Sequence, residues 1–186
     1  SYNQAIKLKP EFAEAYNNLG IILKELNRLD EALASYTKAI EFKSNFYEAY
    51  VNFAIIVKNI RFSSLKSELY SPLLKILTKG NFARPSDLAQ SILSLLKHDI
   101  QIKDLLLKKN IFMSIKEVIY NVQVLNKHQL LHHLMRVCPL PDIQFENFFV
   151  KMRSCILSNL EKIHESPELI YFLSTLSLHC FVNEYV

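Results

Sequence analysis

The sequence holds 186 residues, half of them hydrophobic, and is long enough to bury a core in one or two domains. Its formal charge of +4 is spread along the chain and forms no basic stripe, so nucleic acid is not an expected partner. Its two glycines, Gly20 and Gly80, lie far apart, which excludes the glycine-rich loops that hold dinucleotides, S-adenosylmethionine or nucleoside triphosphates.

An internal repeat opens the chain. The segment SYNQAIKLKPEFAEAYNNLGIILK returns 34 positions later as SYTKAIEFKSNFYEAYVNFAIIVK, with thirteen identical positions. Small residues at Gly20 and Ala32, tyrosines at Tyr16 and Tyr36, and Pro10 ahead of the first helix accompany this period. The pattern resembles the tetratricopeptide repeat, in which each repeat is a pair of antiparallel helices that stacks on its neighbours.

The repeat predicts three helices in chain order. The first is expected over residues 11–26, the turn NRLD follows, and the second is expected over 31–42. The next first helix is expected over 46–60. Asp30 has a side chain suited to capping the second helix.

The small residues of the repeat have a packing role. Two helices approach closely only where a small side chain lies at their crossing, so Gly20 and Ala32 are expected at that point. The fold expected for residues 1–62 is a partial solenoid of about two tetratricopeptide repeats, which begins inside a longer array.

Two asparagines, Asn18 and Asn52, occupy equivalent positions one repeat apart. Helix packing does not require an amide there, whereas an amide can donate to and accept from the backbone of an extended peptide. The segment AYNNLG is similar to the first helices of the O-linked N-acetylglucosamine transferases, whose repeats carry an asparagine ladder. The predicted peptide-binding residues are therefore Asn17, Asn18, Lys24, Asn52 and Lys58; a solvated face without a ligand is the alternative.

The 34-residue register fails after residue 60, where Lys66 replaces the alanine of the helix crossing. The remainder, residues 63–186, is predicted to be an irregular α-helical domain, so the whole chain is expected to be all-α. Pro72 suits the first turn of a helix, and Gly80 suits a helix end. Ser86 is predicted to cap the helix that follows.

Residues 84–186 carry a second resemblance. The segments RPSDLAQSILSLLKHD, PLPDIQFENFFVKMRSCIL and LSLHCFVNEYV look like the helical linker of bacterial proteins in which tetratricopeptide repeats precede a class I S-adenosylmethionine-dependent methyltransferase domain. This resemblance implies that a catalytic domain follows Val186. It also implies that the present chain holds no catalytic residue and no cofactor.

Other candidate sites have simpler explanations. His128 and His132 have a spacing that can bind zinc, but no second ligand cluster is evident, so no metal is expected. The cysteines lack a paired spacing and predict reduced thiols in a cytoplasmic protein. The longest apolar run, which starts at Leu169, is too short to span a membrane.

The function expected from these patterns is protein–protein interaction, with a peptide or partner protein on the face of the first helices. The lysine clamp of cochaperone repeats is not matched, because Asn17 and Val51 stand at the position of its lysine. Three assignments stay open for the full-length protein: a methyltransferase, a glycosyltransferase similar to O-linked N-acetylglucosamine transferase, and a non-catalytic scaffold. The sequence does not predict an oligomeric state.

Overall fold

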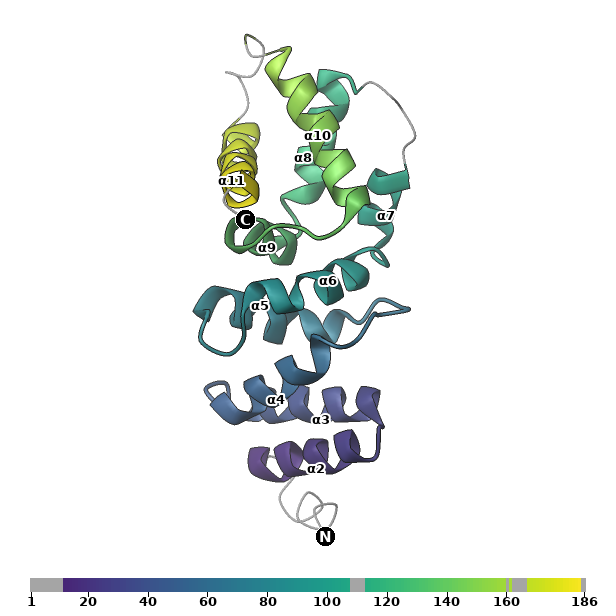
Figure 1. Ribbon diagram of the computed structural model, residues 1–186, viewed down its shortest axis with the longest axis vertical. Coiled ribbons are helices and arrows are strands. Elements are labelled where there is room, and N and C mark those ends of the chain that lie inside the picture. The colour runs from purple at the N-terminus through teal and green to yellow at the C-terminus, as the bar shows by residue number, and fades with distance from the viewer. Residues whose placement is uncertain (1–11, 108–112, 160, 162–166, 185–186) are drawn as a thin grey trace. The chain divides into compact units, whose positions relative to one another are not determined.

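The computed structural model describes residues 12–107, 113–159, 161 and 167–184, and its regular elements within these ranges are all helices (Figure 1). The predicted all-α fold is therefore confirmed. The elements are α2 (Ala13–Glu25), α3 (Leu29–Phe42), α4 (Tyr47–Val57), the 3-10 helix η1 (Ser67–Leu69), α5 (Tyr70–Lys79), α6 (Pro85–Leu96), α7 (Ile100–Leu107), α8 (Ile115–Leu125), α9 (Gln129–Val137), α10 (Ile143–Leu157) and α11 (Pro167–Glu184).

The chain divides into two compact units. The first comprises residues up to Ile60 together with Lys66–Leu88, and the second comprises Arg61–Leu65 together with the residues from Ala89 onward. Helices α2 to α5 thus belong to the first unit, α7 to α11 belong to the second, and the division falls inside α6. The first unit extends beyond residue 62, where the sequence predicts the repeats to end.

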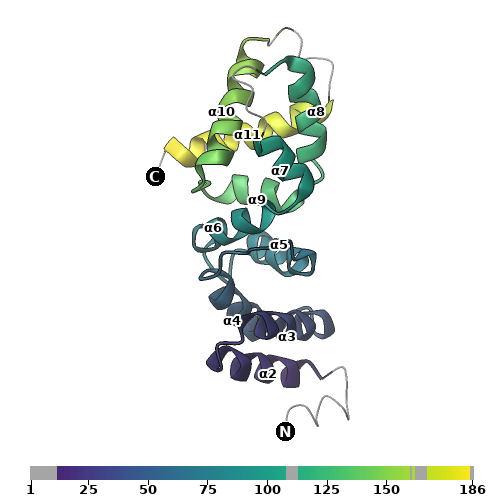
Figure 2. The same cartoon turned by 90° about the vertical axis from the view of Figure 1, so that its right-hand side faces the viewer.

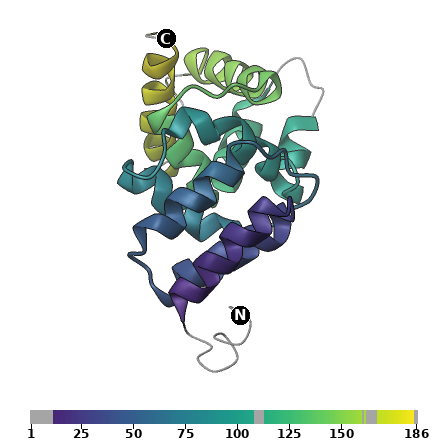
Figure 3. The same ribbon diagram turned by 60° about the horizontal axis from the view of Figure 1, so that its bottom comes forward.

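Helices α2 and α3 run side by side along their lengths (Figure 3). Gly20 of α2 is buried against the ring of Tyr36 in α3, and both Tyr36 and Ala32 are fully buried. The expected close approach at small residues is confirmed. Because glycine has no side chain, the Tyr36 ring can occupy the space beside the α2 backbone.

The turn between α2 and α3 differs from the predicted one. Asn27 adopts a left-handed conformation with φ of 58°, and the Arg28 amide donates to the Leu23 carbonyl at 2.8 Å, which closes the end of α2. Helix α3 then begins at Leu29, so the prediction that Asp30 caps it is wrong. Asp30 lies in the first turn of α3, where its charge is favourable to the helix dipole, and accepts a hydrogen bond from Lys66.

Helix α4 packs on both α2 and α3, with Tyr50 and Phe53 fully buried. The α-helix after α4 starts later than the repeat predicts. One 34-residue period after the start of α3 is residue 63, whereas α5 starts at Tyr70. Pro72 lies in the first turn of α5 and Gly80 ends it with φ of 68°, as predicted. Helix α6 begins at Pro85, so Ser86 lies inside the helix and its predicted capping role is wrong.

The second unit is built around aromatic side chains. Helices α8 and α10 lie side by side and α11 runs across them (Figure 2). Phe145 and Phe149 of α10 and Phe172 of α11 are fully buried, and rings of Phe149 and Phe172 are 6.4 Å apart. Among the described residues, no helix is both long enough and apolar enough to cross a membrane.

We expect Gly20→Ala to destabilise the first unit. An added Cβ would lie 2.6 Å from Tyr36 Cε1, and the fully buried ring has no room to retreat. Overpacking of this kind costs roughly 1–3 kcal/mol, which exceeds the gain of roughly 0.5–1 kcal/mol from replacing glycine inside a helix. Urea denaturation should show a lower midpoint for the variant; an unchanged or higher midpoint would contradict the close-contact role of Gly20.

We expect His132 to make the second unit sensitive to acid. Burial lowers the pKa of His132 from 6.5 to about 4, and its ring contacts Phe172 and shares a hydrogen bond with Thr175. The unfolded chain therefore takes up the proton first, so stability is complete above pH 6.5 and falls between pH 6.5 and 4. The loss amounts to about 3 kcal/mol.

Chemical denaturation at several pH values measures this loss. His132→Leu should reduce the pH dependence over this interval to the part that comes from His128, whose pKa burial also lowers. His133→Gln, one residue along the same helix and half-buried, should retain the full dependence. A dependence of undiminished size in His132→Leu would show that another group is responsible.

Candidate peptide-binding face

The candidate face is formed by α2 and α4, the first helices of the two successive repeats. These helices contact each other within the first unit. Asn17, Asn18 and Lys24 lie on α2 and Asn52 lies on α4. Lys58 directly follows α4. The repeat thus brings four of the predicted residues onto two adjacent helices and the fifth to the end of one of them.

Asn17 and Asn52 form a direct hydrogen bond between the two helices. The Asn52 Nδ2 donates to the Asn17 Oδ1 at 3.1 Å, and Asn17 is only 7% exposed. An amide pair at this position fixes α4 against α2, because a one-residue shift would leave a buried oxygen without a donor. Asn17 therefore has a structural role in addition to any contact with a ligand.

The sequence pattern did not identify this pair. It matched Asn18 with Asn52 because they are 34 positions apart, whereas the hydrogen bond joins residues 35 positions apart. Val51 stands one period after Asn17, so the pair does not repeat along the chain. The doublet Asn17–Asn18 was the available signal for this bond. Neighbouring residues of a helix point in different directions, so one amide of the doublet can face α4 while the other does not.

The other predicted residues keep their polar groups accessible. Asn18 and Lys24 are half-buried and Lys58 is exposed. Within the described part of the chain, these three side chains form no hydrogen bond or ion pair. Their amide and ammonium groups are therefore not committed to the fold.

Apolar side chains accompany the polar ones on both helices. Ile55 lies three residues after Asn52 on α4 and is 39% exposed, and Ile21, its equivalent on α2, is half-buried. Helical spacing of three residues makes Ile55 a neighbour of Asn52 on the surface of α4, and Lys58 follows three residues later at the end of the helix. This alternation of amide, apolar and cationic groups suits a peptide better than a small polar ligand.

One lysine near this face is already paired. Lys43, between α3 and α4, forms an ion pair with Glu14 of α2 at 2.8 Å, and both side chains are about half exposed. An exposed pair of this kind contributes little stability, but it occupies the Lys43 ammonium. Lys24 and Lys58 are the cations of the face that lack such a partner among the described residues.

The two histidines with a zinc-binding spacing, His128 directly before α9 and His132 within it, belong to the second unit. The His128 Nε2 is 3.8 Å from Asp99 Oδ1. In the ranges that the structure describes, no three His, Cys, Asp or Glu side chains are grouped closely enough to hold a metal ion.

We expect Asn52→Ala to lower the stability of the first unit by about 1–2 kcal/mol, because it leaves the buried Asn17 oxygen without a donor. Asn18→Ala is the matched control. Both substitutions gain the same helix propensity, so the difference between their urea midpoints isolates the hydrogen bond. Equal midpoints would show that the Asn17–Asn52 bond does not stabilise the helix pair.

Comparison with known families supports this assignment of the helices. A model of the tetratricopeptide repeat matches residues 13–46, which comprise α2, α3 and the loop that leads to α4. No curated protein and no solved structure matches the chain. Residues 13–46 therefore form a tetratricopeptide repeat, and protein–protein interaction is the function that this repeat suggests.

Proposed function

We propose that this chain is a protein-interaction module that binds an extended peptide segment of a partner on the face of α2 and α4. The observation that carries the proposal is that Asn18 and Lys24 on α2 and Lys58 at the end of α4 have side chains without partners among the described residues. An exposed Ile55 lies next to them on α4. Side chains that form no hydrogen bond or ion pair within the fold are the ones available to contact a peptide.

The chemistry of the face indicates the type of peptide. An amide such as Asn18 can bond to a peptide backbone independently of its side chains. The Asn52 oxygen, which the bond to Asn17 does not use, can accept from an N–H donor. Lys24 and Lys58 favour an acidic side chain, while Ile55 favours an apolar one. The proposed ligand is an extended peptide with alternating acidic and apolar residues.

A narrower proposal concerns the full-length protein. The resemblance of residues 84–186 to the linkers of bacterial methyltransferases supports a role in bringing a cytoplasmic protein partner to an S-adenosylmethionine-dependent domain. The repeats alone support a glycosyltransferase or a non-catalytic scaffold equally well. In each case the proposal gives the chain a binding role without catalysis or a cofactor, and a protein instead of nucleic acid as its partner. A glycine-bearing strand–loop–helix encoded after Val186 would distinguish the methyltransferase.

Peptide selection from a random display library against the full chain tests the binding proposal. Enriched peptides should lose about tenfold in affinity for Asn18→Ala, because one hydrogen bond to the peptide backbone is removed without a loss of stability. The double variant Lys24→Gln/Lys58→Gln should weaken binding and reduce its salt dependence. Fluorescence anisotropy with labelled peptides measures both effects.

Glu41→Ala provides the matched control for this experiment, since Glu41 is exposed on α3, the second helix of the repeat. Its affinity should equal that of the unmodified protein. The proposal is wrong if no peptide is enriched, or if the enriched peptides bind the Asn18 and lysine variants as tightly as the control.

A further inference from the structure

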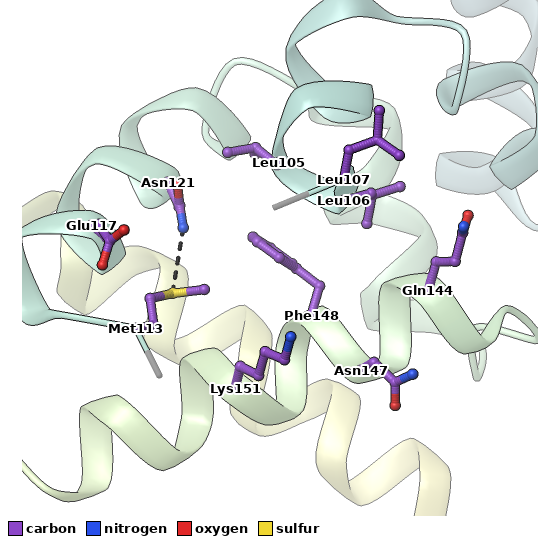
Figure 4. A pocket seen from close by; sticks show the side chains of 10 residues that line it. All are labelled: Leu105, Leu106, Leu107, Met113, Glu117, Asn121, Gln144, Asn147, Phe148 and Lys151. Carbon is purple, nitrogen blue, oxygen red and sulfur yellow. Dashed lines mark hydrogen bonds between the residues drawn. The ribbon is translucent and has the colours of Figure 1, made fainter. Parts of the chain in front are cut away.

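The second unit contains a cavity that the proposed peptide face does not use. It has a volume of about 420 Å³ and lies between α7, α8 and α10 (Figure 4). Small-molecule sites in proteins usually occupy roughly 300–1,000 Å³ and are lined mainly by apolar side chains. Here Leu105, Leu106, Met113 and Phe148 supply the apolar walls.

Asn121 of α8 provides the buried polar group of this cavity. The residue is fully buried, and its Nδ2 donates to the Met113 Sδ at 3.4 Å, a weak acceptor. Its Oδ1 has no donor among the described residues. A buried amide oxygen without a donor is unfavourable and rare in folded proteins, so a donor from outside the chain would be stabilising at this position.

The Met113 side chain is the neighbour of the Asn121 amide in the cavity. Figure 4 shows its thioether directly beside the Asn121 amide on one side of the cavity. Methionine side chains are flexible and make only weak hydrogen bonds, so a ligand with a stronger donor and acceptor can displace the sulfur. Displacement of the sulfur would free the Asn121 Nδ2 to donate to a ligand.

The charged residues of the cavity favour a neutral ligand. Glu117 and Lys151 line it, are both half-buried, and carry opposite charges. The Glu117 carboxylate also accepts hydrogen bonds from the Ser114 backbone amide at 2.8 Å and from the Ser114 hydroxyl at 2.9 Å in the capping box of α8. The walls thus present no net charge to neutralise an ionic ligand.

We propose that this cavity binds a neutral aromatic molecule that carries a primary carboxamide or a lactam. The N–H of such a group donates to the Asn121 Oδ1, and its neighbouring carbonyl accepts from the Asn121 Nδ2 in place of the Met113 sulfur. The ring packs against Phe148 and the leucines of α7. Two hydrogen bonds to one amide distinguish this class from apolar compounds of similar size.

A pair of probes tests the proposal on the full chain labelled with ¹³C at its methionine methyl groups. The chain has three methionines, and Met135 on α9 serves as an internal reference. Benzamide should shift the Met113 signal and leave Met135 unchanged. N,N-dimethylbenzamide, which lacks the N–H donor, should bind about tenfold more weakly.

Two variants with the same chemical change locate the effect. Asn121→Leu should remove the preference for benzamide, whereas Asn147→Leu at the exposed rim of the same cavity should retain it. Equal affinities of the two probes for the unmodified protein, or no shift of Met113, would overturn the proposal. Because this comparison needs no substitution, it is decisive even if Asn121→Leu fails to fold.

Discussion

The close contact between Gly20 and Tyr36 determines how the first unit is assembled. A glycine at the crossing lets the buried tyrosine ring lie directly against the α2 backbone, and this contact sets the distance between α2 and α3. Helix α4 packs on both of these helices, so its position depends on the same distance. The Asn17–Asn52 hydrogen bond forms only because α4 is held at the correct height along α2.

The second unit achieves stability by a different route. It has no helix crossing over a glycine in the described residues, and its helices are held by buried phenylalanines and by side-chain caps at Ser114 and Asp142. Irregular packing of this kind leaves buried polar groups such as Asn121 and His132 inside the unit. Burial changes the chemistry of both groups. The Asn121 oxygen lacks a hydrogen-bond donor, and the His132 ring stays neutral at physiological pH.

The two candidate sites therefore use different recognition principles. On the repeat, accessible amide and ammonium groups are spaced along two helices, an arrangement that suits an extended chain with its own backbone donors and acceptors. In the second unit, a single buried amide stands among apolar side chains, which suits a compact neutral molecule. The candidate peptide-binding face depends on the repeat period, whereas the cavity depends on one oxygen, the Asn121 Oδ1, that lacks a hydrogen-bond donor.

The sequence by itself determined the features that local rules control. The 34-residue period predicted α2, α3 and α4, and the backbone preferences of proline and glycine placed Pro72 in the first turn of α5 and Gly80 at its end. It also placed the candidate binding residues on the first helices of the repeats or, for Lys58, directly after one. These features depend on the conformation of neighbouring residues or on a pattern that recurs along the chain.

Only the tertiary structure decided which polar groups find partners. The sequence matched Asn18 with Asn52, but packing of α4 on α2 brought Asn17 to Asn52 instead. Likewise, the burial of Asn121 beside a cavity and of His132 against α11 follows from contacts between helices distant in sequence. Such contacts depend on the exact distance and rotation of helices, which a one-dimensional pattern of residue types does not specify.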